Sequence, residues 1–160
     1  MTVKEFLDYL SQELNRSPRT VISYAEDLYA FEAYFLDKDE GLTWETIDTD
    51  IIRDWMESMV DKGNSPSSVA RRLSAVKGFF KFALAREFIS SDPAHAIRSP
   101  KRSRPLPQFL KENEINDLLD KQAWGDDFKG LRDRLIIMMF YETGVRLAEL
   151  VGMDDEAVNL

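Results

Sequence analysis

Residues 65–84 read SPSSVARRLSAVKGFFKFAL, and this stretch predicts a long amphipathic helix. Ser65 followed by Pro66 is a typical helix start, because serine accepts a hydrogen bond from the first turn and proline has no N–H to satisfy there. We expect the helix to continue to about Phe88. Helical spacing places one set of apolar side chains on a single face: Val69, Leu73, Val76, Phe80, Ala83 and Leu84. This face predicts a helix that packs into a core.

The opposite face of the same helix carries small and basic residues: Arg71, Ser74, Ala75, Gly78 and Lys81. A glycine inside a helix costs about 1 kcal/mol relative to alanine, which suggests that something large approaches the backbone there. A neighbouring helix and DNA fit this face equally well, and the pattern alone favours neither.

Three more helices are predicted ahead of this one, on the apolar spacing of their residues. Their expected ranges are 3–14, 17–36 and 48–63. The second begins with Ser17-Pro18, so the Ser-Pro start signal occurs twice. Residues 1–97 are therefore predicted to form one domain with four helices.

Residues 98–107 read RSPKRSRPLP, with three prolines and four basic residues. Such a composition is typical of a stiff, extended, cationic connector, so we place a linker at 98–108 and a second domain at 109–160. The second domain predicts helices over 112–119 and 128–143, then a short third helix. Three short helices cannot enclose much of a core, so we expect this segment to be the start of a larger domain.

The charge of the chain is unevenly distributed. The net charge of −8 would argue against nucleic acid, since phosphate binding depends on neutralisation by Lys and Arg. Residues 65–104, however, contain nine basic and two acidic side chains. A strongly basic middle therefore lies between two acidic ends.

Several site classes are excluded by composition. The chain has no cysteine and one histidine, His95, so disulfides, thiolate metal sites and histidine clusters for zinc are excluded. No apolar run approaches the roughly 20 residues that cross a bilayer, and the acidic N-terminus does not resemble a secretory signal. We expect a cytoplasmic protein without a metal or membrane association.

Residues 141–150, YETGVRLAEL, carry the candidate chemistry. Gly144 predicts a left-handed helix end that places Arg146 on the first turn of the next helix, where free N–H groups also favour anions. A guanidinium there can donate two parallel hydrogen bonds to a phosphate and stabilise its transition state. Glu149, one turn further, can hold the guanidinium in orientation. Without further context an ordinary surface ion pair explains Arg146 and Glu149 better.

This box resembles the one around the first catalytic arginine of the tyrosine recombinases. The matching residues are Thr143, Gly144, Arg146, Glu149 and Leu150. The resemblance extends through the basic helix, Asp92-Pro93-Ala94, Pro100-Lys101, Leu106-Pro107 and Glu114-Ile115, and is strongest to Xer-type recombinases and related integrases. It implies a four-helix SAM-like core-binding bundle, followed by the first helices of a truncated mixed α/β catalytic domain. As present, the chain is therefore expected to be all-α.

The resemblance also implies roles for individual residues. Arg146 would be catalytic, with Gly144 and Glu149 in support. DNA contacts would come from the starts of the second and fourth helices and from the connector: Thr20, Tyr24, Ser68, Arg71, Arg72, Lys77, Lys101, Arg102 and Arg104. Two of these have another interpretation, since Arg72 also fits a border position beside the core and Tyr24 also fits the core edge.

The reaction that the resemblance implies is cleavage of one DNA strand by a tyrosine, a 3′-phosphotyrosyl intermediate, and rejoining to a partner strand. It needs no cofactor, acts on a double-stranded recombination site, and takes place in a tetramer of protomers on paired sites. In the family the tyrosine and the other catalytic groups follow the first-arginine box, and Tyr141, His95, Lys111 and Lys121 match none of them. We therefore expect these 160 residues to bind duplex DNA without cleaving it.

Alternatives remain at two levels. Within the family, Xer-type resolution of chromosome dimers and a mobile-element integrase differ in target and partners, and the lack of an extra domain before Val3 mildly favours the Xer type. Outside it, a non-catalytic helical DNA-binding protein or a protein-interaction bundle would fit the helices.

Overall fold

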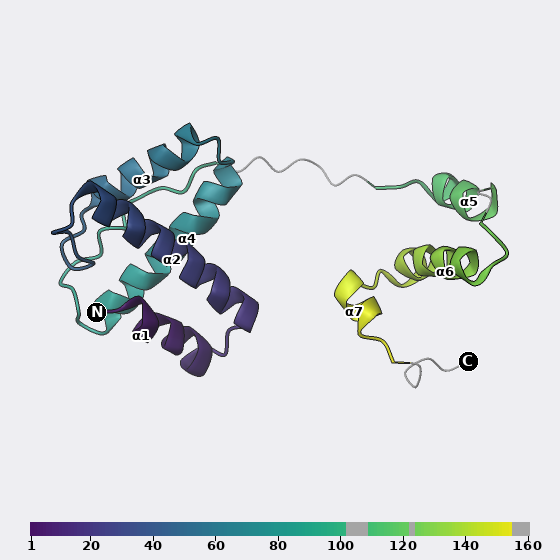
Figure 1. The fold of residues 1–160 in the computed structure, drawn as a ribbon, viewed down its shortest axis with the longest axis horizontal. Helices are drawn as coiled ribbons and strands as arrows, with labels where there is room; N and C mark the ends of the chain where they lie inside the picture. The colour runs from purple at the N-terminus through teal and green to yellow at the C-terminus, as the bar shows by residue number, and fades with distance from the viewer. Residues whose placement is uncertain (102–108, 122–123, 155–160) are drawn as a thin grey trace. The chain divides into compact units, whose positions relative to one another are not determined.

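Figure 1 shows the computed structural model of the chain, which describes residues 1–101, 109–121 and 124–154. The chain forms two compact units that divide between Pro105 and Leu106. Unit 1 holds α1 (Val3–Asp8), the π-helix η1 (Tyr9–Glu13), α2 (Pro18–Lys38), α3 (Thr49–Asp61) and α4 (Pro66–Ala85). Unit 2 holds α5 (Glu112–Lys121), α6 (Phe128–Thr143) and α7 (Leu147–Val151). All regular elements in the described residues are helices, which confirms the all-α fold class.

Helices α2, α3 and α4 of unit 1 begin at capping residues that the sequence indicates. Ser17 accepts a hydrogen bond from the backbone N–H of Thr20 at 3.3 Å, and Ser65 accepts one from Ser68 at 3.2 Å. Asp48 caps α3 by accepting from two backbone N–H groups, each at 2.9 Å. These caps satisfy donors that the first turn of a helix leaves unpaired.

The predicted end of α4 near Phe88 is wrong, because the helix ends at Ala85. Glu87 adopts a left-handed conformation with a φ of 60°. The N–H of Phe88 then reaches back to the carbonyl of Ala83 at 2.9 Å, which closes the helix end.

The core of unit 1 is built around α4, which packs against α1, α2 and α3 (Figure 1). Its buried face is wider than predicted. Phe79 and Phe82 are buried, whereas Leu84, predicted to be in the core, is 40% exposed. The ring of Phe79 lies 4.3 Å from that of Trp44, centre to centre. A helix covered on several sides buries residues that a single-face projection assigns to solvent.

The small-residue face of α4 accommodates neighbouring helices. A Cβ built on Gly78 would lie 3.4 Å from Phe6 of α1 and 3.5 Å from Tyr24 of α2. Ala75, on the same face, is fully buried. Of the two interpretations that the sequence leaves open here, the structure therefore supports a neighbouring helix.

The segment after α4 returns along the bundle toward the start of α3. The hydroxyl of Thr49 donates to the carbonyl of Pro93 at 2.9 Å, and Ala94 and Ile97 are buried. This segment brings the chain to the beginning of the basic connector at Arg98.

Unit 2 buries little. Among its described residues Ile115 alone is buried, and α6 contains no buried residue although its middle is strongly apolar. Trp124 links α5 to the turn before α6 by donating from Nε1 to the carbonyl of Leu118 at 3.1 Å. The expectation that these helices enclose only a small core is confirmed for the part that the structure describes. No helix in that part is long and apolar enough to cross a membrane.

Replacing Phe79 with Ala is expected to lower the free energy of unfolding by about 3–5 kcal/mol, because a buried phenyl ring leaves a cavity beside Trp44. Leu84→Ala, on the same helix, should cost about 1 kcal/mol or less, since Leu84 is largely exposed. Urea denaturation of the two variants, followed by circular dichroism, measures both. Equal losses would contradict the observed core.

Candidate nucleic-acid interface

The starts of α2 and α4 combine capped helix ends with basic side chains. In Figure 1, α4 begins at the upper right of unit 1 and α2 at its lower right. The hydroxyl of Thr20 lies 2.9 Å from that of Ser17, and the hydroxyl of Ser68 lies 3.0 Å from that of Ser65. Free N–H groups and the positive end of the helix dipole make such starts favourable for phosphate.

Arg71 lies between these two helices. Its Nη2 donates to Asp27 Oδ1 at 2.9 Å, its Nη1 donates to Asp27 Oδ2, and Nη1 also donates to the hydroxyl of Ser23 at 2.8 Å. Asp27 is 5% exposed at its side chain, whereas that of Arg71 is 51% exposed. Arg71 therefore joins α4 to α2 and still presents half of its surface to solvent.

The carboxyl of Asp27 is buried at the centre of this contact. Burial raises the pKa of Asp27 above its ordinary value, an effect that outweighs the hydrogen bond from Arg71 and the charges of Arg71 and Arg72, which lower it. Loss of hydration therefore disfavours the ionised form of Asp27 more than its arginine partners stabilise it.

Arg72 approaches the same carboxylate from the edge of the core. Its Nε lies 3.8 Å from Asp27 Oδ1, and its Nη1 lies 3.7 Å from the sulfur of Met59. The buried Nε makes no hydrogen bond within the described residues. This placement matches the border position that the sequence offers as an alternative to a DNA contact.

Tyr24 lies at the edge of the core, on the rim of a groove. Its ring centre is 6.1 Å from that of Phe6, and the tyrosine packs against the core cluster. The groove, of about 290 Å³, runs between η1, α2 and α4 and includes Thr20, Tyr24 and Gly78 in its lining. Tyr24 therefore combines a packing role with access to this groove.

Lys77 and Lys101 differ in their surroundings. The ammonium of Lys77 donates to the carbonyl of Ile97 at 2.5 Å, so it is held at the base of the connector. Lys101 is exposed. Arg102 and Arg104, predicted to contact DNA from the connector, lie outside the described residues.

In unit 2 the structure confirms the predicted helix end at Gly144 but places Arg146 differently from the prediction. Gly144 caps α6 in the left-handed conformation, with φ 64° and ψ 17°. Arg146 is the N-cap of α7, one position before the first turn on which it was expected. Its backbone N–H and its Nη1 each donate to the carboxylate of Glu149 at 2.9 Å. The Arg146 side chain remains 83% exposed.

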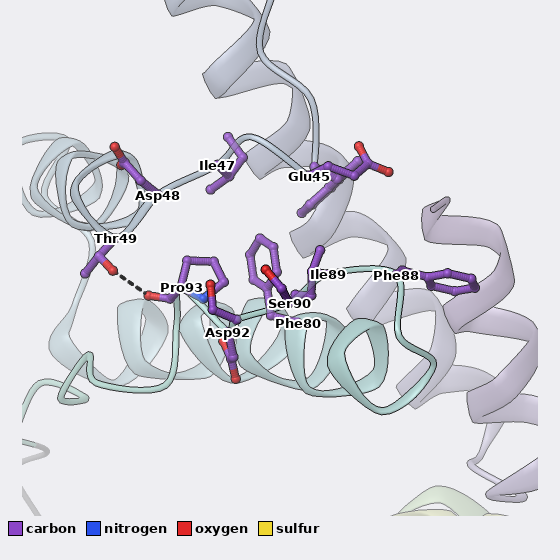
Figure 2. Close-up of a pocket in the computed structure, with 12 residues that line it drawn as sticks. Glu45, Ile47, Asp48, Thr49, Phe80, Phe88, Ile89, Ser90, Asp92 and Pro93 are labelled. Carbon is purple, nitrogen blue, oxygen red and sulfur yellow. Dashed lines mark hydrogen bonds between the residues drawn. The ribbon is translucent and has the colours of Figure 1, made fainter.

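A pocket of about 480 Å³ lies elsewhere in unit 1, between the chain before α3 and the segment after α4 (Figure 2). It includes Phe80 and three acidic residues, Glu45, Asp48 and Asp92, and none of its lining residues is basic. Its electrostatics therefore disfavour phosphate. It shares no residue with the groove beside Tyr24.

Comparison with known proteins identifies the family. The profile of the phage integrase N-terminal SAM-like domain matches residues 3–87, which contain α1 to α4. The chain belongs to the phage integrase family. This assignment confirms the SAM-like bundle that the sequence resemblance implies.

Several relatives of this phage integrase domain are tyrosine recombinases. XerC of Natranaerobius thermophilus is 38% identical over 156 residues, covering 98% of this chain and 52% of the relative. XerC of Pseudomonas aeruginosa is 36% identical over 156 residues, covering 97% of this chain and 50% of the relative. XerD of Oceanobacillus iheyensis is 28% identical over 158 residues, covering 99% and 52%. The chain spans about half the length of the curated relatives it matches.

Two solved structures share the fold. A lambda integrase dimer bound to a COC′ core site matches with a TM-score of 0.65 and 21% identity, over 99% of this chain and 43% of the integrase chain. A dimer of lambda integrase residues 75–356 on the same site matches with a TM-score of 0.66 and 22% identity, over 99% and 56%. At this level of identity the likeness concerns the fold.

Arg16 and Lys81 are candidate contacts that the sequence interpretation missed. Both line the groove beside Tyr24, and neither forms an ion pair within the described residues. Lys81 lies on the small-residue face of α4, and Arg16 lies in the turn before Ser17. A signal was present, because Arg16 lies four positions before Thr20 and Lys81 four positions after Lys77, and both Thr20 and Lys77 were predicted to contact DNA. Arg86 also lines the groove but pairs with Glu13.

The amide resonance of Arg146 is expected to report the protonation of Glu149. Because the backbone and side chain of Arg146 donate to this carboxylate, they lower the pKa of Glu149 below 4.5. The contact is therefore present at neutral pH and is lost only as the pH falls through the lowered pKa. An NMR titration should give a midpoint below 4.5, and Glu149→Gln should abolish that step. A midpoint at or above the ordinary value would contradict the contact.

Proposed function

We propose that these residues form the DNA-binding front part of a tyrosine recombinase, and that unit 1 binds the phosphate backbone of duplex DNA across the starts of α2 and α4. The observation that carries the proposal is the half-exposed Arg71, which lies in the second turn of α4 and is held against Ser23 and Asp27 of α2, in a bundle of the phage integrase family. Guanidinium groups and helix starts both favour phosphate oxygens.

The local charge supports this proposal more than the net charge opposes it. Arg16 and Lys81 line the groove beside Tyr24, which Thr20 also lines. Lys101 is exposed at the beginning of the connector. Phosphate binding depends on the cations that reach the backbone, and acidic side chains elsewhere act mainly through screened, long-range repulsion.

For the longer protein we propose site-specific recombination, in which a tyrosine cleaves one DNA strand, forms a 3′-phosphotyrosyl link and passes the strand to a partner. Arg146 is the proposed catalytic arginine of this reaction. Its guanidinium uses Nη1 for Glu149, and its remaining donors are available to the non-bridging oxygens of a phosphate. The polypeptide of 160 residues would bind without cleaving, because none of its residues matches the tyrosine nucleophile.

Within the family we favour a Xer-type role in resolving chromosome dimers in the cytoplasm, carried out by a tetramer of protomers on paired sites. What supports this role is the identity of 36–38% to proteins named XerC. A mobile-element integrase is the second candidate, and the fold shared with lambda integrase supports it.

Duplex binding should depend steeply on salt. We expect the 160-residue chain to bind a mixed-sequence duplex at low salt, with a logarithmic slope of about −0.9 for each phosphate neutralised. Arg71→Ala should weaken binding about tenfold and make the slope shallower by about one unit. Fluorescence anisotropy against salt concentration measures both, with Leu84→Ala as a control outside the proposed interface.

Lack of binding at low salt would refute the proposal and would favour a protein-interaction bundle. Unchanged affinity of Arg71→Ala would remove Arg71 from the interface.

In a polypeptide that also carries the rest of the catalytic domain, Arg146→Ala should lower covalent capture of a nicked duplex by a factor of about 100 to 1,000.

A further inference from the structure

We propose that Asp27, an acidic residue, is a positioning residue for DNA binding, which holds Arg71 in the arrangement that meets phosphate. The inference rests on the proposed function of unit 1. It has an unusual consequence, because removing this negative charge should weaken the binding of a polyanion.

The geometry fixes Arg71 more firmly than a surface arginine. Both terminal nitrogens donate to the two carboxylate oxygens of Asp27, and Nη1 also donates to Ser23. A two-point contact of this kind defines the plane of the guanidinium. These three hydrogen bonds leave two of the five N–H donors, one on Nη2 and the Nε–H, on a side chain that is 51% exposed.

Arg72 depends on the same carboxylate. Two adjacent arginines on α4 repel one another, and Asp27 lies between them with its Oδ1 3.8 Å from Arg72 Nε. That nitrogen is buried without a hydrogen-bond partner among the described residues, so the carboxylate is the charge that offsets it. One buried anion therefore supports two cations, and the cluster keeps a positive charge.

Stability alone does not account for a buried carboxylate here. Burying a charge costs free energy that an ion pair often fails to recover, and an apolar contact between α2 and α4 would join the helices as well. The raised pKa of Asp27 agrees, since it shows that burial outweighs the attraction of its partners. What an apolar contact cannot supply is a fixed guanidinium, and prior ordering reduces the entropy lost on binding.

Asp27→Asn and Glu26→Gln form a matched pair of variants. Both remove one negative charge from adjacent positions of α2, but Glu26 is exposed and forms no ion pair within the described part of the chain. If charge alone mattered, both variants would bind duplex slightly more tightly. If Asp27 positions Arg71, Asp27→Asn should bind about tenfold more weakly while Glu26→Gln does not.

A double-mutant cycle separates positioning from a general effect on the fold. Anisotropy with a mixed-sequence duplex is measured for wild type, Asp27→Asn, Arg71→Ala and the double variant, with folding checked by circular dichroism. The expected result is that Asp27→Asn has little further effect once Arg71 is absent. An equal loss in both backgrounds would overturn the inference, and so would wild-type or tighter binding by Asp27→Asn.

The remaining outcomes are also decisive. If wild type itself fails to bind at low salt, the proposed function fails, whereas binding by wild type with no loss in Asp27→Asn refutes only the role of Asp27. Should Asp27→Asn not fold, Arg71→Lys decides, because it keeps the charge and loses the two-point contact. Several-fold weaker binding by Arg71→Lys supports the inference, and wild-type affinity overturns it.

Discussion

The burial of α4 among α1, α2 and α3 constrains the rest of unit 1. Its second half supplies Phe79 and Phe80 to the aromatic core, and its first half supplies Arg71 and Arg72. Because one rigid helix carries both sets, the packing that stabilises the bundle also sets where the arginines lie. The wide buried face and the close approach of Phe6 and Tyr24 at Gly78 follow from this central position.

An acidic protein can bind DNA when its basic side chains are concentrated at one surface and its acidic side chains make structural contacts away from that surface. In unit 1 several acidic side chains have local structural duties: Asp48 caps α3, and Glu32 accepts from Nε1 of Trp44 at 2.7 Å. Asp27 is the informative case, because it lies within the basic cluster itself. In the proposed role, the negative charge of Asp27 orders Arg71 beside it. This charge also weakens the long-range attraction between the protein and DNA, and the order that it imposes offsets that loss.

Local signals in the sequence predicted much of this structure, and contacts between distant residues account for what was missed. Ser17, Asp48, Ser65 and Gly144 act through neighbours within a few positions, so their caps could be identified from spacing alone. The contact of Arg71 with Asp27 joins residues 44 positions apart, and no periodicity reports it. For the same reason, projection onto one helical face placed Leu84 in the core and overlooked Phe79.

The two proposed phosphate-binding arginines are held in different ways. Arg71 is fixed by a buried carboxylate from another helix, and its position is therefore set by the fold of unit 1. Arg146 is held by Glu149 three residues away, in a contact that is largely exposed and that solvent and salt weaken. Such a local pair orients the guanidinium relative to α7 but does not place α7 itself. That placement depends on what packs against α6, whose apolar Leu135, Met138 and Tyr141 are exposed in the described residues. The proposed DNA-binding arrangement of unit 1 can thus be preset within these residues, whereas the proposed catalytic position of Arg146 depends on packing around α6.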